Sequence, residues 1–150
     1  MSKLRINILV TKEMIIDAKD MIAGRIATVA AKTAILGEDV VIINSELAVI
    51  TGTKKRTLEK YQAQENRGEP FHGPFLPKTP DRFLKRLIRG MLTYKKGKGR
   101  DAFKRITCYR GVPEAFKGKE ITRIEKAHVS RIQHLKYVTI NEICQYIKQQ

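Results

Sequence analysis

Residues 14–44 read MIIDAKDMIAGRIATVAAKTAILGEDVVIIN, and this stretch decides the fold. It begins and ends with short apolar runs, at 14–18 and 40–44. An apolar run that does not alternate with polar residues is typical of a strand covered on both faces. The segment between the runs has helical periodicity. We therefore predict a strand–helix–strand unit with parallel strands and a right-handed crossover.

The helix of this unit is predicted to begin after Asp20, a capping residue, and to end at Gly37. Its apolar stripe consists of Ile22, Ile26, Val29, Thr33 and Leu36. Further short apolar runs at 47–51 and 106–109 predict two more strands. The pattern indicates an α/β fold with four strands.

A basic helix is expected over 52–64, followed by a loop over 67–80, where four prolines and two glycines oppose regular structure. The next helix should start at Thr79 as its capping residue. Pro80 then occupies the first turn, and the carboxylate of Asp81 lies near the positive end of the helix dipole.

The body of that helix divides into two faces. At about 100° per residue, its basic side chains occupy an arc of roughly 100° and its apolar side chains the opposite side. The basic residues are Arg82, Lys85, Arg86 and Arg89. This division predicts a helix that packs on a sheet through one face and presents a basic stripe on the other.

The last third of the sequence is less regular. Residues 94–100 are predicted to form a basic glycine loop, 101–104 a single helical turn, and 110–128 irregular structure. Near the end, Thr139 and Glu142 have the spacing of a capping box before an amphipathic helix.

Most of the positive charge lies between residues 52 and 119. That segment has 19 Lys and Arg against 6 Asp and Glu, which is +13 of the total of +15. A nucleic-acid backbone attracts such a concentration of charge through counterion release, and an anionic membrane attracts it electrostatically. We infer a polyanion-binding surface in the middle of a globular sequence.

At 150 residues, of which 42% are hydrophobic, the chain can form a single domain with its own core. No apolar run approaches the roughly 20 residues of a membrane span, and the first ten residues lack the features of a signal peptide. We therefore expect a cytoplasmic protein. Its two cysteines, Cys108 and Cys144, should be reduced and buried.

Support for a cofactor or a catalytic site is weak. A dinucleotide site needs three glycines in the strand–helix turn, and only Gly24 lies there; Glu46 has the spacing of a ribose contact but is weak support alone. A zinc site would have to combine Cys108, Cys144, His128 and His134, without a closely spaced cysteine pair. We expect no cofactor, no metal, no small-molecule substrate and no catalysis.

Aromatic residues interrupt the proline-rich loop. Phe71, His72 and Phe75 lie between basic segments and could stack on unpaired bases. Alternatively, the two phenylalanines could pin the loop to the core. The sequence leaves both interpretations open.

Several motifs together resemble the universal L-thirteen family of large-subunit ribosomal proteins. The resemblance covers residues 14–116, and the FHGPF loop and the short chain are similar to the archaeal branch. The motifs are IAGRIA at 22–27, VVIINSELAVITGTKKR at 40–56, GPFLPKTPDRFLKRLIRGML at 73–92, the glycine loop at 94–100 and ITCYRGVPEAF at 106–116. Residues 1–10 and 120–150 are less diagnostic, and we expect them to be peripheral extensions of a single domain.

The resemblance implies a three-layer α/β/α fold with a small, mostly parallel four-stranded sheet. It also implies a structural, non-catalytic role in the large ribosomal subunit, with binding to 23S-type rRNA and to neighbouring ribosomal proteins, and support of early subunit assembly. The candidate RNA-binding residues are Lys54, Lys55, Arg56, Arg67, His72, Lys78, Arg82, Lys85, Arg86, Arg89, Lys95, Lys96, Lys98, Arg100, Lys104, Arg105 and Arg110.

Two other classes of function compete with this interpretation. An enzyme acting on nucleic acid or nucleotides would need clustered carboxylates or a glycine-rich cofactor turn, and the sequence shows neither. A protein that binds anionic membranes would need large apolar side chains exposed beside the basic stripe.

Overall fold

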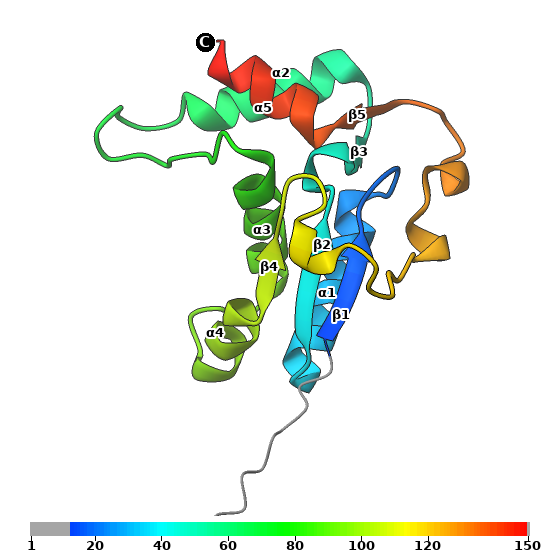
Figure 1. The fold of residues 1–150 in the computed structure, drawn as a ribbon. Helices are drawn as coiled ribbons and strands as arrows, with labels where there is room; N and C mark the ends of the chain where they lie inside the picture. The colour runs from blue at the N-terminus through cyan, green and yellow to red at the C-terminus, as the bar shows by residue number, and fades with distance from the viewer. Residues whose placement is uncertain (1–12, 150) are drawn as a thin grey trace, which may run out of the picture.

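The computed structural model describes residues 13–149, and its first half is the predicted strand–helix–strand unit (Figure 1). Strand β1 (Glu13–Asp17), helix α1 (Ala23–Leu36) and strand β2 (Asp39–Ile43) follow one another. The two strands pair in parallel, with Glu13 opposite Asp39. Strand β4 (Ile106–Cys108) pairs in parallel with the other edge of β2. The order β1-β2-β4 confirms an α/β fold with a small parallel sheet.

The number of strands in this sheet differs from the expected four. The third predicted strand is shorter, β3 (Val49–Thr51), and it pairs antiparallel with β5 (Tyr137–Thr139) in a separate two-stranded sheet. The chain leaves the parallel sheet at Asn44, which has a left-handed conformation with φ 55°, and continues into the 3₁₀ turn η1 (Ser45–Leu47). This turn redirects the backbone before it could pair beside β2.

Helix α1 packs closely on the rest of the core because its inner face is rich in alanine. The buried residues of the helix are Ala23, Ile26, Ala27, Ala30, Ala31 and Ala34. Gly37 ends the helix as predicted, with φ 103° and its N–H bonded to the Ala34 carbonyl at 3.2 Å. Asp20 is not the N-cap. It has φ 56° and precedes two residues that pair with other segments, so the helix begins after Ile22. Leu36, expected on the apolar stripe, is 74% exposed.

Both faces of the parallel sheet are covered. Helices α1 and α3 (Pro80–Met91) pack on one face, where Val40 and Ile42 are buried. On the other face, Ile15, Val41 and Ile43 form a small cluster with Phe116 of the 3₁₀ turn η2 (Glu114–Phe116). In the described residues, a short turn thus covers this face, where the expected three-layer arrangement would place a helix.

Helices α2 (Lys54–Glu65) and α5 (Ile140–Lys148) lie side by side across the end of the molecule. The hydroxyl of Thr139 accepts the N–H of Glu142 at 3.2 Å, which confirms the predicted cap. The main core includes three buried isoleucines of α5, Ile140, Ile143 and Ile147. Residues 1–10, the other expected extension, lie outside the described residues.

The segment between β4 and β5 wraps around the sheet. It contains, besides η2, the 3₁₀ turns η3 (Glu125–Ala127) and η4 (Val129–Arg131) and is otherwise irregular, as predicted for 110–128. Its Thr122 donates to the Ile15 carbonyl at 2.8 Å and so covers the open edge of β1. The sheet of the βαβ half is therefore covered on its faces and at the β1 edge, and it supports the basic segments on the other side of the molecule.

Candidate nucleic-acid interface

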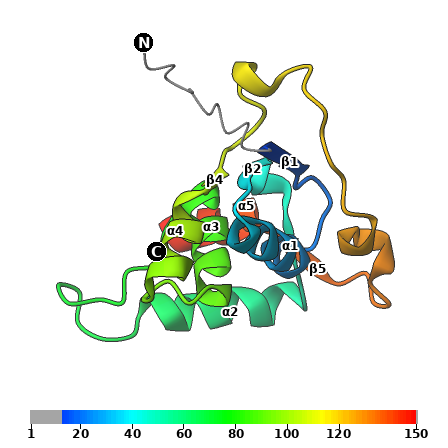
Figure 2. The ribbon, with the colours of Figure 1, turned by 90° about the horizontal axis from the view of Figure 1, so that it is seen from below.

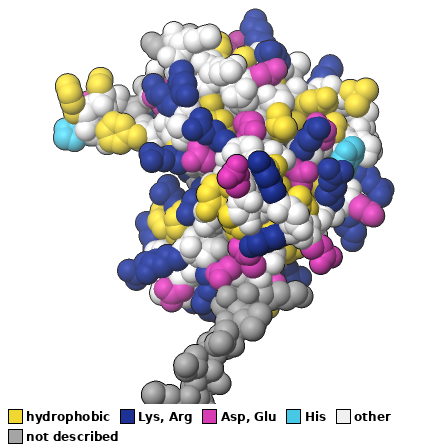
Figure 3. All heavy atoms as spheres, in the orientation of Figure 1, with side chains coloured by type: hydrophobic (Ala, Val, Ile, Leu, Met, Phe, Trp, Pro, Cys, Tyr) yellow, Lys and Arg dark blue, Asp and Glu magenta, His cyan; other side chains and the backbone are white. Residues whose placement is uncertain are grey.

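Most of the basic segments lie on one side of the fold. Helices α2 and α3, the loop that joins them and α4 (Gly97–Lys104) form the side of the molecule away from β1 (Figures 1 and 2). Lys and Arg side chains gather along the α3–α4 side in Figure 3, with acidic side chains interspersed on the face toward the viewer. Each helix packs on the rest of the fold through a few buried residues, such as Tyr61 of α2, Phe83 of α3 and Ala102 of α4.

The first turn of α2 carries three exposed cations, Lys54, Lys55 and Arg56, and no acidic residue. The N-cap residue Thr53 makes no side-chain cap hydrogen bond. Cations at the positive end of a helix dipole are unfavourable for the isolated helix, whereas an anion bound there is favourable. Lys54 is partly neutralised by Glu142 at 3.5 Å. This helix end is suited to a phosphate group.

The loop between α2 and α3 projects from the body and exposes its aromatic residues (Figures 1 and 3). Phe71 is 91% exposed and Phe75 is 67% exposed, so the interpretation that they pin the loop to the core is wrong. His72 is also exposed, with its Nε2 3.8 Å from the Glu69 carboxylate. Two open aromatic rings beside cations are suited to stacking on unpaired bases.

The base of this loop is held in place by its own contacts. The guanidinium of Arg86 donates to the Phe75 carbonyl, and Lys78 pairs with Glu65 at 3.2 Å. At the neck, a Cβ on Gly68 would lie 2.1 Å from the Gly73 carbonyl oxygen, so only glycine fits. These contacts hold the base of the loop against α2 and α3.

Helix α3 has the two faces that its sequence predicts. Phe83, Leu84 and Ile88 are buried, while Arg82 is exposed. Thr79 is the N-cap residue and Pro80 and Asp81 lie in the first turn, as predicted. The Thr79 hydroxyl, however, makes no cap hydrogen bond.

The other basic side chains of α3 are half-buried and oriented by neighbours. The ammonium of Lys85 lies 5.0 Å from the ring centroid of Phe103, and the guanidinium of Arg89 lies 4.9 Å from that of Tyr94. Such cation–π contacts restrict the rotamers of long side chains while the charges remain available.

The basic glycine segment is more regular than predicted. Lys95 and Lys96 lie in a turn, but Gly97 begins α4, so Lys98, Arg100 and Lys104 lie on a helix. Gly99 is required here, because a Cβ at this position would lie 2.2 Å from the Thr93 carbonyl oxygen. The glycine allows the backbone of α4 to pack closely against the backbone at Thr93.

Two candidate residues lie at the edge of this surface. The Arg105 guanidinium is 3.5 Å from the Ala34 carbonyl at the end of α1, which leaves it half-buried. Arg110 is exposed beyond β4.

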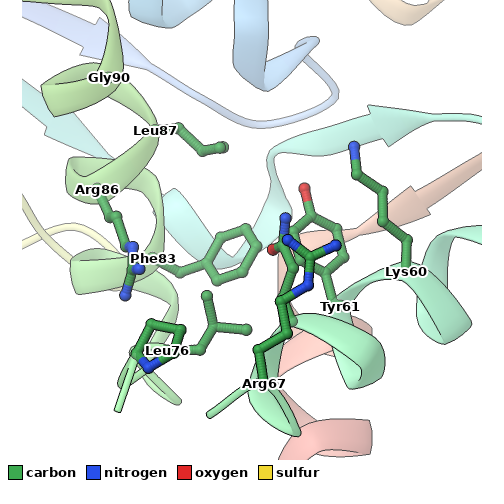
Figure 4. Close-up of a pocket in the computed structure, with 10 residues that line it drawn as sticks. Lys60, Tyr61, Arg67, Leu76, Phe83, Arg86, Leu87 and Gly90 are labelled. Carbon is green, nitrogen blue, oxygen red and sulfur yellow. The ribbon is translucent and has the colours of Figure 1, made fainter. Parts of the chain in front are cut away.

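Arg67, which follows the end of α2, lines a cleft between α2 and α3 together with Arg86 (Figure 4). Lys60 lines the same cleft and is absent from the sequence-based candidates, although it lies within the basic helix expected over 52–64.

The ionisable groups with a shifted pKa are buried, and one of them, Tyr61, lines the cleft between α2 and α3, where burial raises its pKa. Burial raises the pKa of the Cys108 thiol to about 12 and that of Cys144 to about 11, and both cysteines are free, as expected. Within residues 13–149, no three His, Cys, Asp or Glu side chains are grouped so that they could hold a metal ion. None of the described helices is long and apolar enough to cross a membrane.

Comparison with a family model and comparison with single proteins point to the same family. The model of the family described as ribosomal protein L13 matches residues 11–115. The chain is 43% identical over 129 residues to large ribosomal subunit protein uL13 of Methanococcoides burtonii, covering 86% of this chain and 93% of that protein. It is 41% identical to uL13 of Archaeoglobus fulgidus, with coverage of 89% and 86%, and 40% identical to that of Haloarcula marismortui, with coverage of 87% and 88%.

Proposed function

Because this chain belongs to the ribosomal protein L13 family, we propose that it is a structural, non-catalytic constituent of the large ribosomal subunit that binds large-subunit rRNA. The family match is the single observation that carries the step from RNA in general to rRNA. The relatives named above are archaeal proteins, and most of each aligns with this chain. The site of action is therefore the ribosome in the cytoplasm.

The basic side of α2, the projecting loop, α3 and α4 supports this function physically. Only Lys54, His72 and Lys78 of the seventeen candidate residues form ion pairs within the described part of the chain. The remaining cations are available for phosphates, whose counterions they would release. In this role the surface neutralises the backbone where RNA helices converge and would otherwise repel one another.

Recognition by this surface depends mainly on RNA shape and backbone. The bases of double-stranded RNA are hidden in a deep, narrow major groove, so side chains on α3 and α4 contact phosphates and ribose. The exposed rings of Phe71 and Phe75 add stacking on bases that are unpaired. A rigid βαβ scaffold with oriented cations supports early assembly of the subunit, and the other exposed surfaces contact neighbouring ribosomal proteins.

Co-sedimentation with the large subunit, followed by crosslinking, tests this function. We expect the protein to sediment with the large subunit and to crosslink to rRNA through the α2–α4 side. Strong binding to anionic liposomes without affinity for RNA would contradict the proposal. So would a melting temperature raised by several degrees with NAD, ATP or S-adenosylmethionine, because it would indicate a small-molecule site.

A further inference from the structure

The cleft between α2 and α3 has the size and charge of a binding site. Its volume is about 410 Å³, within the range of roughly 300–1,000 Å³ typical of sites for small ligands. Its rim carries Lys60, Arg67 and Arg86, and none of the lining residues is acidic. Figure 4 shows Arg86 and Lys60 at opposite sides of the opening, with Arg67 and Leu76 of the projecting loop between them.

The interior of the cleft is apolar and aromatic. The rings of Tyr61 and Phe83 meet edge to face, with centroids 5.1 Å apart and an interplanar angle of 67°. Leu76 and Leu87 complete the apolar lining, and Gln64 supplies an amide that can bond the edge of a base. A planar apolar group with polar edges fits this lining better than a flexible acidic side chain does.

Gly90 keeps the mouth of the cleft open. It follows Phe83, Arg86 and Leu87 at helical spacing, so a side chain here would extend from the same face of α3. A Cβ on Gly90 would meet nothing within 4 Å, and its φ is not in the left-handed region. Neither backbone strain nor crowding therefore requires a glycine, although glycine weakens a helix interior relative to alanine.

We propose that this cleft binds one unpaired nucleotide of the RNA, with its base against the apolar lining and its phosphate at the cationic rim. The inference rests on the proposed RNA-binding function and assigns a particular recognition element to it. A base inside a duplex is paired and stacked on both sides, so only a nucleotide outside a helix can enter. The rim is continuous with the basic stripe through Arg86, so a single strand that enters the cleft can continue along α3.

Binding titrations with two RNA probes test the proposal. The full chain is titrated against hexaadenylate RNA and against a blunt RNA duplex, at several salt concentrations. Gly90→Leu fills the mouth of the cleft without removing a charge, and Gly24→Leu is the matched control in open space on α1. Melting curves verify that both variants fold, as their uncrowded helical positions predict.

We expect Gly90→Leu to weaken binding of hexaadenylate by about tenfold, because a base can no longer enter the cleft, and to leave duplex binding unchanged. The dependence of affinity on salt should stay the same, because no cation is removed from the rim. If Gly90→Leu matches the wild type on both probes, the cleft proposal fails while the proposed function stands. Equal losses on both probes with a lower salt slope would show a groove for phosphates only. Wild-type protein that binds neither RNA would overturn both proposals.

Discussion

Both carboxylate oxygens of Glu46 accept the backbone N–H of Gly111, at 3.0 and 3.1 Å. The Gly111 carbonyl in turn accepts the N–H of Asn44 at 2.9 Å, so the segments that follow β2 and β4 are tied together. Its spacing made Glu46 a candidate for a ribose contact. Its carboxylate instead accepts a hydrogen bond from the backbone of this chain.

Replacing Glu46 with alanine should lower the free energy of unfolding by about 1.5–3 kcal/mol, because a charge-assisted hydrogen bond is removed and the Gly111 N–H is left half-buried without its acceptor. Urea denaturation followed by circular dichroism measures the change. Glu46→Gln keeps an acceptor oxygen and should lose less. Equal stability of all three proteins would show that the contact contributes nothing.

Two glycines of α4 should respond oppositely to alanine. Gly99→Ala places a Cβ 2.2 Å from the Thr93 carbonyl oxygen and should cost about 1–3 kcal/mol, as overpacking does. Gly97→Ala meets nothing within 4 Å and should be neutral or stabilising by up to about 1 kcal/mol. Thermal melting of the two variants compares them directly, and a Gly99→Ala protein as stable as Gly97→Ala would contradict the close approach.

The buried thiols should make stability depend on pH in the alkaline range. Desolvation by burial raises the pKa of Cys108 from 9.0 to about 12, while the charge of Lys85 acts to lower it and that of Asp81 to raise it. The neutral thiol is therefore favoured in the folded state. Its contribution to the free energy of unfolding is complete below pH 9 and is lost as the pH rises toward 12. Between about pH 8 and pH 10, urea midpoints should fall more for the wild type than for Cys108→Ala. If the urea midpoints of the two proteins fall equally with pH, the Cys108 thiol makes no contribution to the pH dependence of stability.

The same burial should protect both cysteines from reagents. At about pH 8 a disulfide reagent should leave Cys108 and Cys144 of the native protein unmodified and should titrate both thiols after unfolding in guanidinium. Rapid reaction of the native protein would show that the core around β4 and α5 opens readily.

The elements that the sequence predicts correctly are those specified by local patterns. The apolar runs of β1 and β2, the helical stripe of α3 and the stop at Gly37 each lie within one segment. The three-residue strand β5 is too short to give a periodic signal and exists because Val49 pairs with Thr139 across the chain. The cap at Asp20 fails for a similar reason, since the pairing of Met21 and Ile22 with distant backbone delays the helix.

The candidate surface is partly predictable because the net charge of a segment can be counted without knowing how the chain folds. Counting residues selects the stretch from 52 to 119, and periodicity separates the faces of α3. The cleft could not be found in this way, since Tyr61 and Phe83 are brought together only by the packing of α2 and α3 around the loop. The orientation of Lys85 and Arg89 by aromatic rings is likewise a tertiary property.

Replacing Arg82, Lys85, Arg86 and Arg89 with glutamine should weaken RNA binding and reduce its salt dependence. The slope of log affinity against log salt should fall by about 0.7–0.9 for each phosphate that the variant no longer neutralises. The melting temperature should change little, because the charges point away from the buried face of α3. A small decrease is expected from removal of the Arg86 bond to the Phe75 carbonyl and of two cation–π interactions.

A matched control removes the same charge from residues outside the basic segment. Lys19, Lys32, Lys126 and Lys136 are exposed, outside the segment 52–119, and none forms an ion pair within residues 13–149, so their replacement by glutamine also lowers the net charge by four. If binding depends on the cations of α3, the control should keep nearly the wild-type salt slope. If binding depends only on net charge, both variants should lose affinity equally, and the α3 stripe would then not contact RNA. The comparison therefore separates a defined interface from general attraction between a basic protein and a polyanion.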